Sequence, residues 1–389
     1  MKDLMKKFSF ELATEVEFGA GKIDVLAGKL DEMNIEKLLV VTDKGIEKVG
    51  ILEKIESNFD EINYKIYDEV EPNPKEFHVE MGSEIAREYD PDGMIAIGGG
   101  SPIDCAKAIG ALLGSEVDDI EQYYGKGTVK EETLPFIAVP TTAGTGSEVT
   151  FSSVITDSDT NIKKSIRSSF IAPDLSILDP ELTKSLPKSL TAYSGMDAFT
   201  HAVEAYTAKT ATALTNVFAL SSMELILENI EKVYQEPDHI ESRSGMLLGS
   251  TIAGIAFNHS DVASVHCMAE SLGGKYDAPH GLCNSMILPY VMEYNMDYCL
   301  EKYARVAGMM GCEFETVEEG AMKAVDGIKE LNQKLDIPSI DEIGFREQDI
   351  EELAEMSVNN LSNESNPREM KKEDYAKLFT KMSQSSSNR

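Results

Sequence analysis

The sequence predicts an α/β domain over residues 1–187 followed by an all-α domain over residues 188–389. Three observations support this. The 389-residue chain is longer than one hydrophobic core usually organises. Short apolar segments alternate with helical patterns in the first half, and strand-like segments become rare after about Pro187. Residues 173–187, which include an Asp-Pro-Glu-Leu turn, are expected to form the junction.

The first half contains three apolar segments that are typical of buried strands. They span Lys37–Thr42, Gly93–Ile97 and Pro135–Val139, and each is bounded by turn or charged residues. Helical patterns lie between them, for example over Lys75–Tyr89 and Pro102–Leu113. Strands that alternate with helices predict crossover connections and a mostly parallel sheet.

The second half is predicted to be helical throughout. Apolar residues recur at helical spacing in Leu190–Thr207, Ala213–Val233, Ser242–Ala256, Tyr298–Met310, Thr316–Leu335 and Glu347–Leu361. The final segment, Ser383–Arg389, is rich in serine and is expected to be disordered.

Charge and composition exclude several classes of partner. The chain has 36 basic and 68 acidic residues, a net charge of −32, which repels nucleic acid and anionic membranes. It contains no apolar run long enough for a transmembrane helix, and its start does not resemble a signal peptide, so we expect a cytoplasmic protein. The five cysteines include no Cys-x-x-Cys pair and are expected to be reduced thiols.

A glycine-rich turn follows the second predicted strand. Gly98-Gly99-Gly100-Ser101-Pro102 would open a helix whose free N–H groups suit a pyrophosphate, although such a triplet alone is more often a tight turn. The segment Pro140–Glu148 follows the third strand and is rich in threonine and glycine. Asp43 follows the first strand, where a carboxylate can bind ribose hydroxyls or simply cap a helix. Together these segments favour a dinucleotide site at the carboxyl edge of the sheet.

Histidines and an aspartate in the second half suit a divalent metal. Asp197 and His201 are four residues apart and would share one face of a helix, although a surface Asp–His pair has the same spacing. His280 lies between proline and glycine and is expected at a turn. His259 and His266 are seven residues apart, so both could lie on one helical face. Spacing alone does not decide which three histidines join the aspartate.

Taken in order along the chain, these segments resemble the iron-containing (group III) alcohol dehydrogenases, which share a fold with glycerol dehydrogenase and dehydroquinate synthase. The resemblance covers nearly the whole chain. The matching segments are Phe18–Gly21, Thr42–Lys44, Pro72–Pro74, Gly98–Asp104, Pro140–Val149, Asp179–Thr183, Gly195–Tyr206, Pro279–Gly281, Leu288–Pro289 and Asn366–Arg368.

The resemblance implies a ligand set and two cofactors. It assigns the metal to Asp197, His201, His266 and His280, and it leaves His259 as a non-ligand. The implied metal is Fe²⁺, although the same ligands accept Zn²⁺, and the acid after Thr42 implies NAD as the cofactor. With the glycine turn, the resemblance places the NAD contacts on Asp43, Asn73, Gly98, Gly99, Gly100, Ser101, Thr141, Thr142, Thr145, Lys163 and Leu182.

The chain departs from the family pattern near the substrate. Many members have a further histidine four residues after the third metal ligand, where this chain has Glu270. His259 and Asp261 also replace smaller residues. Glu270, or His259 and Asp261, could supply the catalytic proton relay, whereas Glu270 could equally be a surface acid.

The resemblance therefore predicts a metal-dependent dehydrogenase. We expect it to transfer a hydride between NAD and a short primary alcohol or diol, giving the aldehyde, at a site in a cleft between the domains. The alternatives are a glycerol dehydrogenase, a metal- and NAD-using lyase like dehydroquinate synthase, and a nucleotide-binding protein without catalysis. The segments around Asp197 and His280 contain few of the basic residues that such a lyase needs. Family resemblance also predicts a homodimer or larger homo-oligomer.

Overall fold

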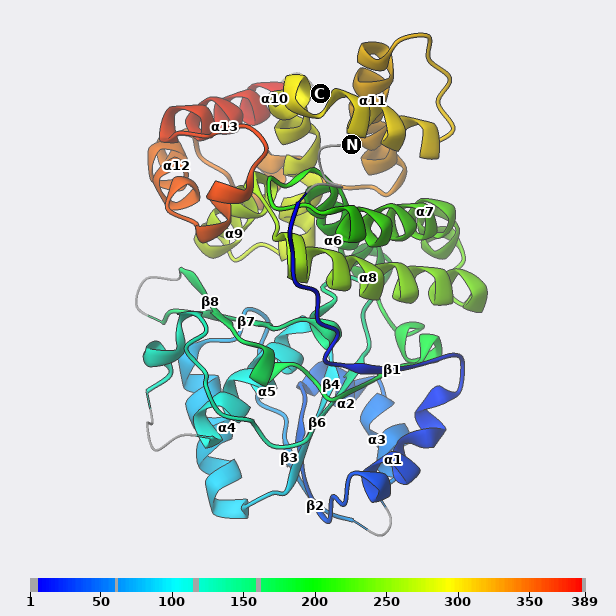
Figure 1. Cartoon of the computed structure of the whole chain (residues 1–389), viewed down its shortest axis with the longest axis vertical. Coiled ribbons are helices and arrows are strands. Elements are labelled where there is room, and N and C mark those ends of the chain that lie inside the picture. The colour runs from blue at the N-terminus through cyan, green and yellow to red at the C-terminus, as the bar shows by residue number, and fades with distance from the viewer. Residues whose placement is uncertain (1–5, 60–61, 115–118, 159–161, 387–389) are drawn as a thin grey trace. The chain divides into compact units, whose positions relative to one another are not determined.

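The computed structural model describes residues 6–59, 62–114, 119–158 and 162–386 (Figure 1). The chain forms two compact units. The first, here called the sheet unit, is Glu11–Leu186, and the second, the helical unit, is Pro187–Arg389 with the amino-terminal residues up to Phe10. The predicted fold class, an α/β region followed by an all-α region, is confirmed.

The sheet unit is built on a six-stranded parallel sheet with the order β1-β9-β6-β4-β2-β3. The three strands predicted from apolar segments form its centre, as β2, β4 and β6. In sheet order the strands are β1 (Glu15–Phe18), β9 (Leu175–Leu178), β6 (Phe136–Pro140), β4 (Gly93–Gly98), β2 (Lys37–Val41) and β3 (Asn63–Tyr67).

Helices cover both faces of this sheet, because alternate residues of the central strands are apolar on each side. Leu39 and Met94 pack on one face with α4 and α5, whereas Leu38 and Ile95 pack on the other with α1 and α3. The helices are α1 (Leu26–Glu32), α2 (Lys44–Lys48), α3 (Ile51–Glu56), α4 (Glu76–Tyr89) and α5 (Gly100–Leu113).

A second, three-stranded sheet with the order β5-β8-β7 completes the sheet unit. Its strands are β5 (Gly125–Lys126), β8 (Lys163–Arg167) and β7 (Ser152–Thr156), and β7 and β8 are antiparallel. The expectation that residues 173–187 form only a junction is wrong for their first part. Strand β9 lies there, buried between β1 and β6, because Leu175–Leu178 is apolar enough to complete the core.

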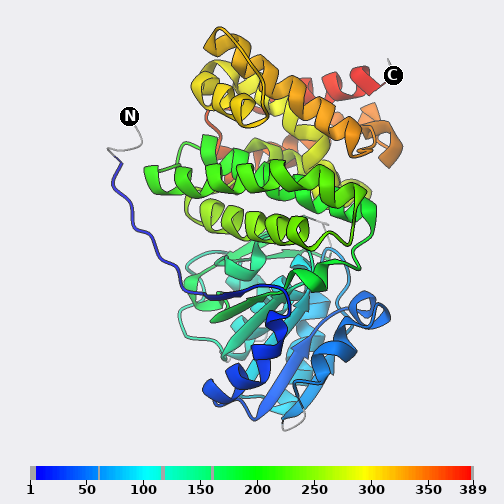
Figure 2. The same ribbon diagram turned by 90° about the vertical axis from the view of Figure 1, so that its right-hand side faces the viewer.

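The helical unit contains longer helices, and α7 and α8 lie side by side within it (Figure 2). The helices are α6 (Lys188–Thr207), α7 (Ala213–Gln235), α8 (Ile240–Ser260), α9 (Ser264–Tyr276), α10 (His280–Met309), α11 (Val317–Lys334), α12 (Ile350–Val358) and α13 (Lys372–Ser386). Neither α9 nor the first half of α10 was among the segments predicted from periodicity, and residues 347–361 form a shorter helix flanked by 3-10 turns.

The carboxyl-terminal helix α13 corrects the expected disorder from Ser383 onward. Ser383 is buried, and its hydroxyl donates a hydrogen bond to the Glu347 carboxylate. Tyr375, Phe379 and Met382 are also buried, and their spacing fits one face of a helix. That apolar face anchors the serine-rich end through Ser386, while residues 387–389 lie outside the described residues.

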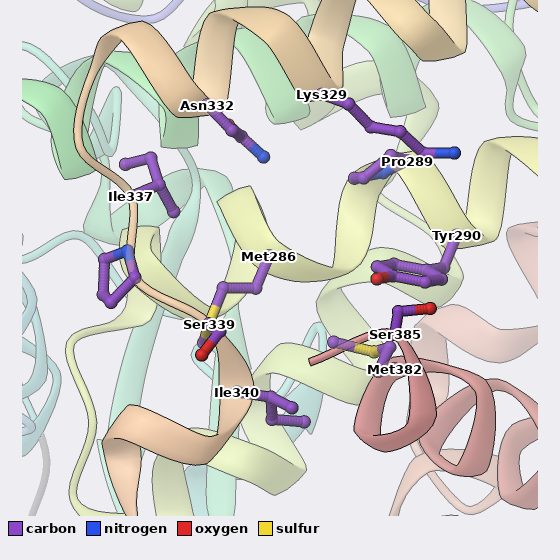
Figure 3. A pocket seen from close by; sticks show the side chains of 11 residues that line it. Met286, Pro289, Tyr290, Lys329, Asn332, Ile337, Ser339, Ile340, Met382 and Ser385 are labelled. Carbon is purple, nitrogen blue, oxygen red and sulfur yellow. The ribbon is translucent and has the colours of Figure 1, made fainter. Parts of the chain in front are cut away.

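A small cavity of about 70 Å³ opens in the helical unit beside α10, α11 and α13 (Figure 3). That volume holds no more than a few water molecules. Its lining residues are Met286, Pro289, Tyr290, Lys329, Asn332, Ile337, Pro338, Ser339, Ile340, Met382 and Ser385, so it includes none of the predicted site residues. Among the described residues, no helix is both long and apolar enough to cross a membrane.

Lys107 on α5 is a buried cation that binds the end of the threonine-rich segment and the residues that follow it. Its ammonium group donates to the carbonyl oxygens of Ser147 (2.6 Å), Thr150 (2.9 Å) and Ser152 (2.8 Å). Burial lowers the pKa of Lys107 to about 8, and the carboxylates of Asp104 and Glu148 oppose that shift. The lysine is therefore mostly protonated at pH 7, and it holds residues 147–152 against α5.

Replacing Lys107 by methionine would remove the buried ammonium donor from all three carbonyl groups. We expect Lys107→Met to lower the free energy of unfolding by about 3 kcal/mol, measured by denaturant titration. Lys126 is exposed on β5, so Lys126→Met is the matched control and should leave stability unchanged. Equal stability of the two variants would contradict the role of Lys107.

Candidate functional site

Four side chains of the helical unit converge in a manner that suits a metal ion. Asp197, His201, His266 and His280 each offer one ligand atom, and these atoms lie within 4.8 Å of one another. Asp197 and His201 come from α6, His266 from α9 and His280 from α10. The set therefore depends on how three helices pack.

Asp197 and His201 lie on one face of α6, as their spacing predicts. Both are almost fully buried, at 3% and 5% exposure. The His201 ring stacks on Phe257 of α8 with 4.4 Å between centroids, and it lies 4.5 Å from the ring of His266. Packing therefore holds the imidazole in one orientation.

His266 is positioned by Glu204, a residue that the sequence analysis missed. The Glu204 carboxylate accepts hydrogen bonds from the backbone N–H groups of Ala263 (2.9 Å) and Val265 (2.7 Å), at the amino terminus of α9. It also lies 2.6 Å from Nδ1 of His266. A carboxylate at this end of a helix is favoured by the helix dipole. Because Nδ1 faces Glu204, Nε2 is the nitrogen that faces the other candidate ligands.

The charge of Glu204 also acts on His266. Burial by itself disfavours the charged imidazole, but the carboxylates of Glu204, Asp197 and Glu270 outweigh it and raise the pKa of His266. A strongly basic imidazole is also a strong electron-pair donor. Residue 204 lies one turn beyond His201 on α6, which is a spacing signal that could have identified it.

His280 is the first residue of α10 rather than part of an isolated turn. The glycine of the Pro-His-Gly sequence is required by packing. A Cβ atom at Gly281 would lie 2.3 Å from the Tyr193 carbonyl oxygen of α6. Only glycine allows α10 to approach α6 this closely. The approach places Nε2 of His280 3.8 Å from Oδ1 of Asp197.

Asn284 is a second residue that the sequence analysis missed. It lies one turn after His280 on α10, and its side-chain nitrogen is 2.6 Å from Oδ1 of Asp197.

With three imidazole nitrogens and one carboxylate oxygen, the cluster matches the donor set that Zn²⁺ or Fe²⁺ accepts. The residues present therefore fit a divalent metal.

The two predicted catalytic residues have different surroundings. His259 is in the last turn of α8, and its ring stacks on Phe10 with 4.1 Å between centroids. The expectation that His259 and His266 share a helical face is wrong, because α8 ends at Ser260 and Asp261 has a φ of 66°. Glu270 lies one turn after His266 on α9 and accepts a 2.5 Å hydrogen bond from Asn360.

The Asp261 carboxylate makes hydrogen bonds that stabilise the local structure. Its carboxylate accepts bonds from the hydroxyl groups of Ser362 (3.0 Å) and Ser365 (2.9 Å). These bonds connect the segment between α8 and α9 to the 3-10 helix Leu361–Ser365. The replacement of a smaller residue by Asp261 therefore has a structural explanation.

The glycine turn of the sheet unit lies where β4 meets α5. Gly98 has a φ of 152°, which side chains rarely adopt, and Gly99 is the N-cap of α5 without a side-chain capping bond. A Cβ atom at Gly99 would lie 3.2 Å from Thr142, and one at Gly100 only 2.8 Å from Thr145. The glycines thus let both threonines approach the start of α5, where free N–H groups suit a phosphate.

The two carboxylate oxygens of Asp43 contact different groups at the carboxyl edge of the sheet. Its Oδ1 accepts bonds from the backbone N–H groups of Gly45 (2.7 Å) and Ile46 (3.1 Å), so Asp43 is the N-cap of α2. Its Oδ2 would lie 3.4 Å from a Cβ atom at Gly98, beside the glycine turn. The capping alternative is therefore correct, and the second oxygen still faces the predicted nucleotide site.

The other predicted NAD contacts are placed as follows. The Thr141 N–H donates to the Gly98 carbonyl oxygen (2.9 Å), Ser101 lies in the first turn of α5, and Lys163 begins β8. Asn73 has a left-handed backbone with a φ of 53° between two prolines. Leu182 is 2% exposed and packs in the core, so only its backbone is available to a cofactor.

Loss of the Glu204 carboxylate should loosen both α9 and His266. We expect Glu204→Ala to weaken Zn²⁺ binding by about 10- to 100-fold and to lower the thermal midpoint, because His266 loses its orienting partner. Zn²⁺ affinity is measured by competition with a chromogenic chelator. Glu228 is exposed on α7 and serves as the control, as Glu228→Ala. Unchanged affinity of the Glu204 variant would show that another contact orients His266.

Comparison with known proteins identifies the family of this chain. The family model described as "Iron-containing alcohol dehydrogenase" matches residues 13–180, and "Fe-containing alcohol dehydrogenase family, C-terminal" matches residues 191–383. A 1,3-propanediol dehydrogenase of Klebsiella pneumoniae is 38% identical over 369 residues, covering 93% of this chain and 95% of that protein. An NAD-dependent methanol dehydrogenase of Bacillus methanolicus is 35% identical over 366 residues, covering 93% and 96%.

Solved structures are similar over the same length. A crystal structure of 1,3-propanediol oxidoreductase superimposes with a TM-score of 0.94 at 37% identity and covers 97% of this chain and 100% of that chain. An alcohol dehydrogenase from Oenococcus oeni has the same TM-score at 34% identity, also covering 97% and 100%. The chain therefore belongs to the iron-containing alcohol dehydrogenase family and is an oxidoreductase.

Proposed function

We propose that this enzyme oxidises short primary alcohols or diols to aldehydes with NAD as the hydride acceptor. We further propose that Asp197, His201, His266 and His280 hold a divalent metal, Fe²⁺ or with the same ligands Zn²⁺. The convergence of three imidazoles and one carboxylate from three helices is the observation that carries this proposal. Such a set is far more specific than any of the four residues alone.

Each part of the protein has a separate task in this proposal. A divalent ion at the cluster would supply Lewis acidity that lowers the pKa of an alcohol hydroxyl. The cluster carries only one carboxylate among its ligands, so the ion's positive charge is not cancelled. Glu204 and Phe257 keep the imidazoles of His266 and His201 in fixed orientations. NAD would accept the hydride, and the chain positions it and supplies charge.

The sheet unit supplies what a dinucleotide needs. Gly98, Gly99 and Gly100 leave the amino terminus of α5 open to a pyrophosphate, and Thr142 and Thr145 lie beside it. A related butanol dehydrogenase of Clostridium saccharobutylicum, 34% identical over 380 residues, is NADPH-dependent, whereas the methanol dehydrogenase is NAD-dependent. The choice between cofactors therefore depends on local residues, and the carboxylate of Asp43 favours NAD.

Glu270 is the better candidate for the proton relay. Its carboxylate is close enough to His266 to contribute to the raised pKa of that imidazole, whereas the ring of His259 is packed on Phe10. The lyase alternative finds no support among the related proteins named above, which are dehydrogenases. Glycerol as the substrate, the cytoplasmic location and the homo-oligomeric state stay predictions.

The proposal is tested by NADH formation in anaerobically purified protein. We expect turnover with Fe²⁺ or Zn²⁺, none after chelation, and a preference among short alcohols, diols and glycerol that identifies the substrate class. His280→Ala should abolish both metal retention and turnover, because one of the four ligands is lost. Bound NAD without turnover on any metal or alcohol would overturn the proposed reaction.

The role of Asp43 is tested with a variant that keeps the helix cap. Asparagine is also a good N-cap, so Asp43→Asn should preserve α2 while removing the charge that repels a 2′-phosphate. We expect the ratio of kcat/KM for NAD to that for NADP to fall by about tenfold, since like charges about 4 Å apart repel by on the order of 1–4 kcal/mol. Asp43→Gly should give a similar change. An unchanged ratio would remove this role from Asp43.

A further inference from the structure

The amide of Asn284 lies among three of the four candidate ligand atoms. Its side-chain nitrogen is 2.6 Å from Oδ1 of Asp197, 3.2 Å from Nε2 of His266 and 3.2 Å from Nε2 of His280. Asn284 is fully buried, so water does not compete for these contacts. The amide thus contacts ligand atoms from α6, α9 and α10 at once.

The amide nitrogen of Asn284 is a hydrogen-bond donor, and two of its three neighbours are acceptors. The Asp197 carboxylate accepts hydrogen bonds, and Nε2 of His266 is an acceptor because Nδ1 of that ring faces Glu204. An amide nitrogen has two hydrogens, so it cannot satisfy three acceptors at the same time. It also has no available lone pair, so this nitrogen cannot itself bind an ion.

The other end of the amide is not held by the protein. Within the described residues, Oδ1 of Asn284 is buried and has no hydrogen-bond partner. A buried acceptor without a partner costs stability, so the contacts of the amide nitrogen must account for the orientation of this side chain. The ligand cluster is therefore what orients Asn284.

We propose that Asn284 is a positioning residue of the metal site. Its two N–H groups hold the Asp197 carboxylate and one imidazole of the cluster, that of His266 or His280, before the ion arrives, and this preorganisation sets the affinity for the ion. A hydrogen bond to the ligating carboxylate also orients it after binding, as second partners of metal ligands commonly do. The inference rests on the proposed function, because it needs a metal at the cluster.

The test measures Zn²⁺ binding rather than activity. The full-length metal-free protein is titrated with Zn²⁺ against a chromogenic chelator, for the wild type and for Asn284→Ala. We expect the variant to bind Zn²⁺ about 10- to 100-fold more weakly. Equal affinity of the two proteins would overturn the inference while leaving the proposed function intact. Failure of the wild type to bind Zn²⁺ would instead overturn the proposed function.

Asn295 provides a matched control on the same helix. It is also buried on α10, and its amide exchanges 2.9 Å hydrogen bonds with Asn366 instead of contacting the ligand cluster. Asn295→Ala therefore removes a comparable buried amide, and its Zn²⁺ affinity should equal that of the wild type. A similar loss of affinity in both variants would indicate a general structural effect and would overturn the specific role of Asn284.

A second variant keeps the inference testable if Asn284→Ala does not fold. Asn284→Asp has nearly the same size but places a carboxylate beside Asp197. We expect it to lower the thermal midpoint of the metal-free protein and to enlarge the upward shift that Zn²⁺ produces, because an ion would offset the added repulsion. A Zn²⁺-induced shift equal to that of the wild type would show that residue 284 does not act on the metal.

Discussion

The buried carboxylate of Glu204 joins α6 to the start of α9, and the geometry of the ligand cluster depends on this junction. Burying a carboxylate is costly unless it is fully hydrogen-bonded. Here the cost is offset by backbone N–H groups of Ala263 and Val265 and by the ring of His266. The same interaction thus starts a helix and orients a candidate ligand. Gly281 has the corresponding effect between α6 and α10, because it removes the side chain that would keep them apart.

In the sheet unit, the groups at the candidate site are hydrogen-bond donors, whereas those of the helical unit are lone-pair donors. At the carboxyl edge of the sheet, the N-cap residue Gly99 makes no side-chain capping bond at the start of α5, and Lys107 holds residues 147–152 against that helix. The net charge of −32 opposes any anionic ligand. Local N–H groups must therefore provide the attraction for a pyrophosphate. The helical unit instead gathers lone pairs, which attract a cation.

In both units, candidate site residues lie beside residues that hold the local structure in place. The hydrogen bonds between Glu204 and His266 and between Lys107 and Ser147 join segments that are far apart in the chain. Such buried polar contacts are favourable only when every group is paired. Oδ1 of Asn284 is an exception, because it has no hydrogen-bond partner in the described part of the chain, and its residue lies beside the candidate metal ligands.

The sequence by itself determined the fold class, the central strands β2, β4 and β6, and the spacing of Asp197 and His201 on α6. Continuous apolar segments and helical periodicity are local signals, so each strand or helix is predicted from its own segment and the fold class from the order of the segments. Strand β9 was missed because four residues carry little periodicity, and α13 was missed because its serines masked an apolar face. Only the tertiary structure shows that Glu204 and Asn284 contact the candidate metal ligands and that Lys107 holds residues 147–152 against α5. Their partners are contributed by other helices or loops, so packing rather than local sequence brings them into contact.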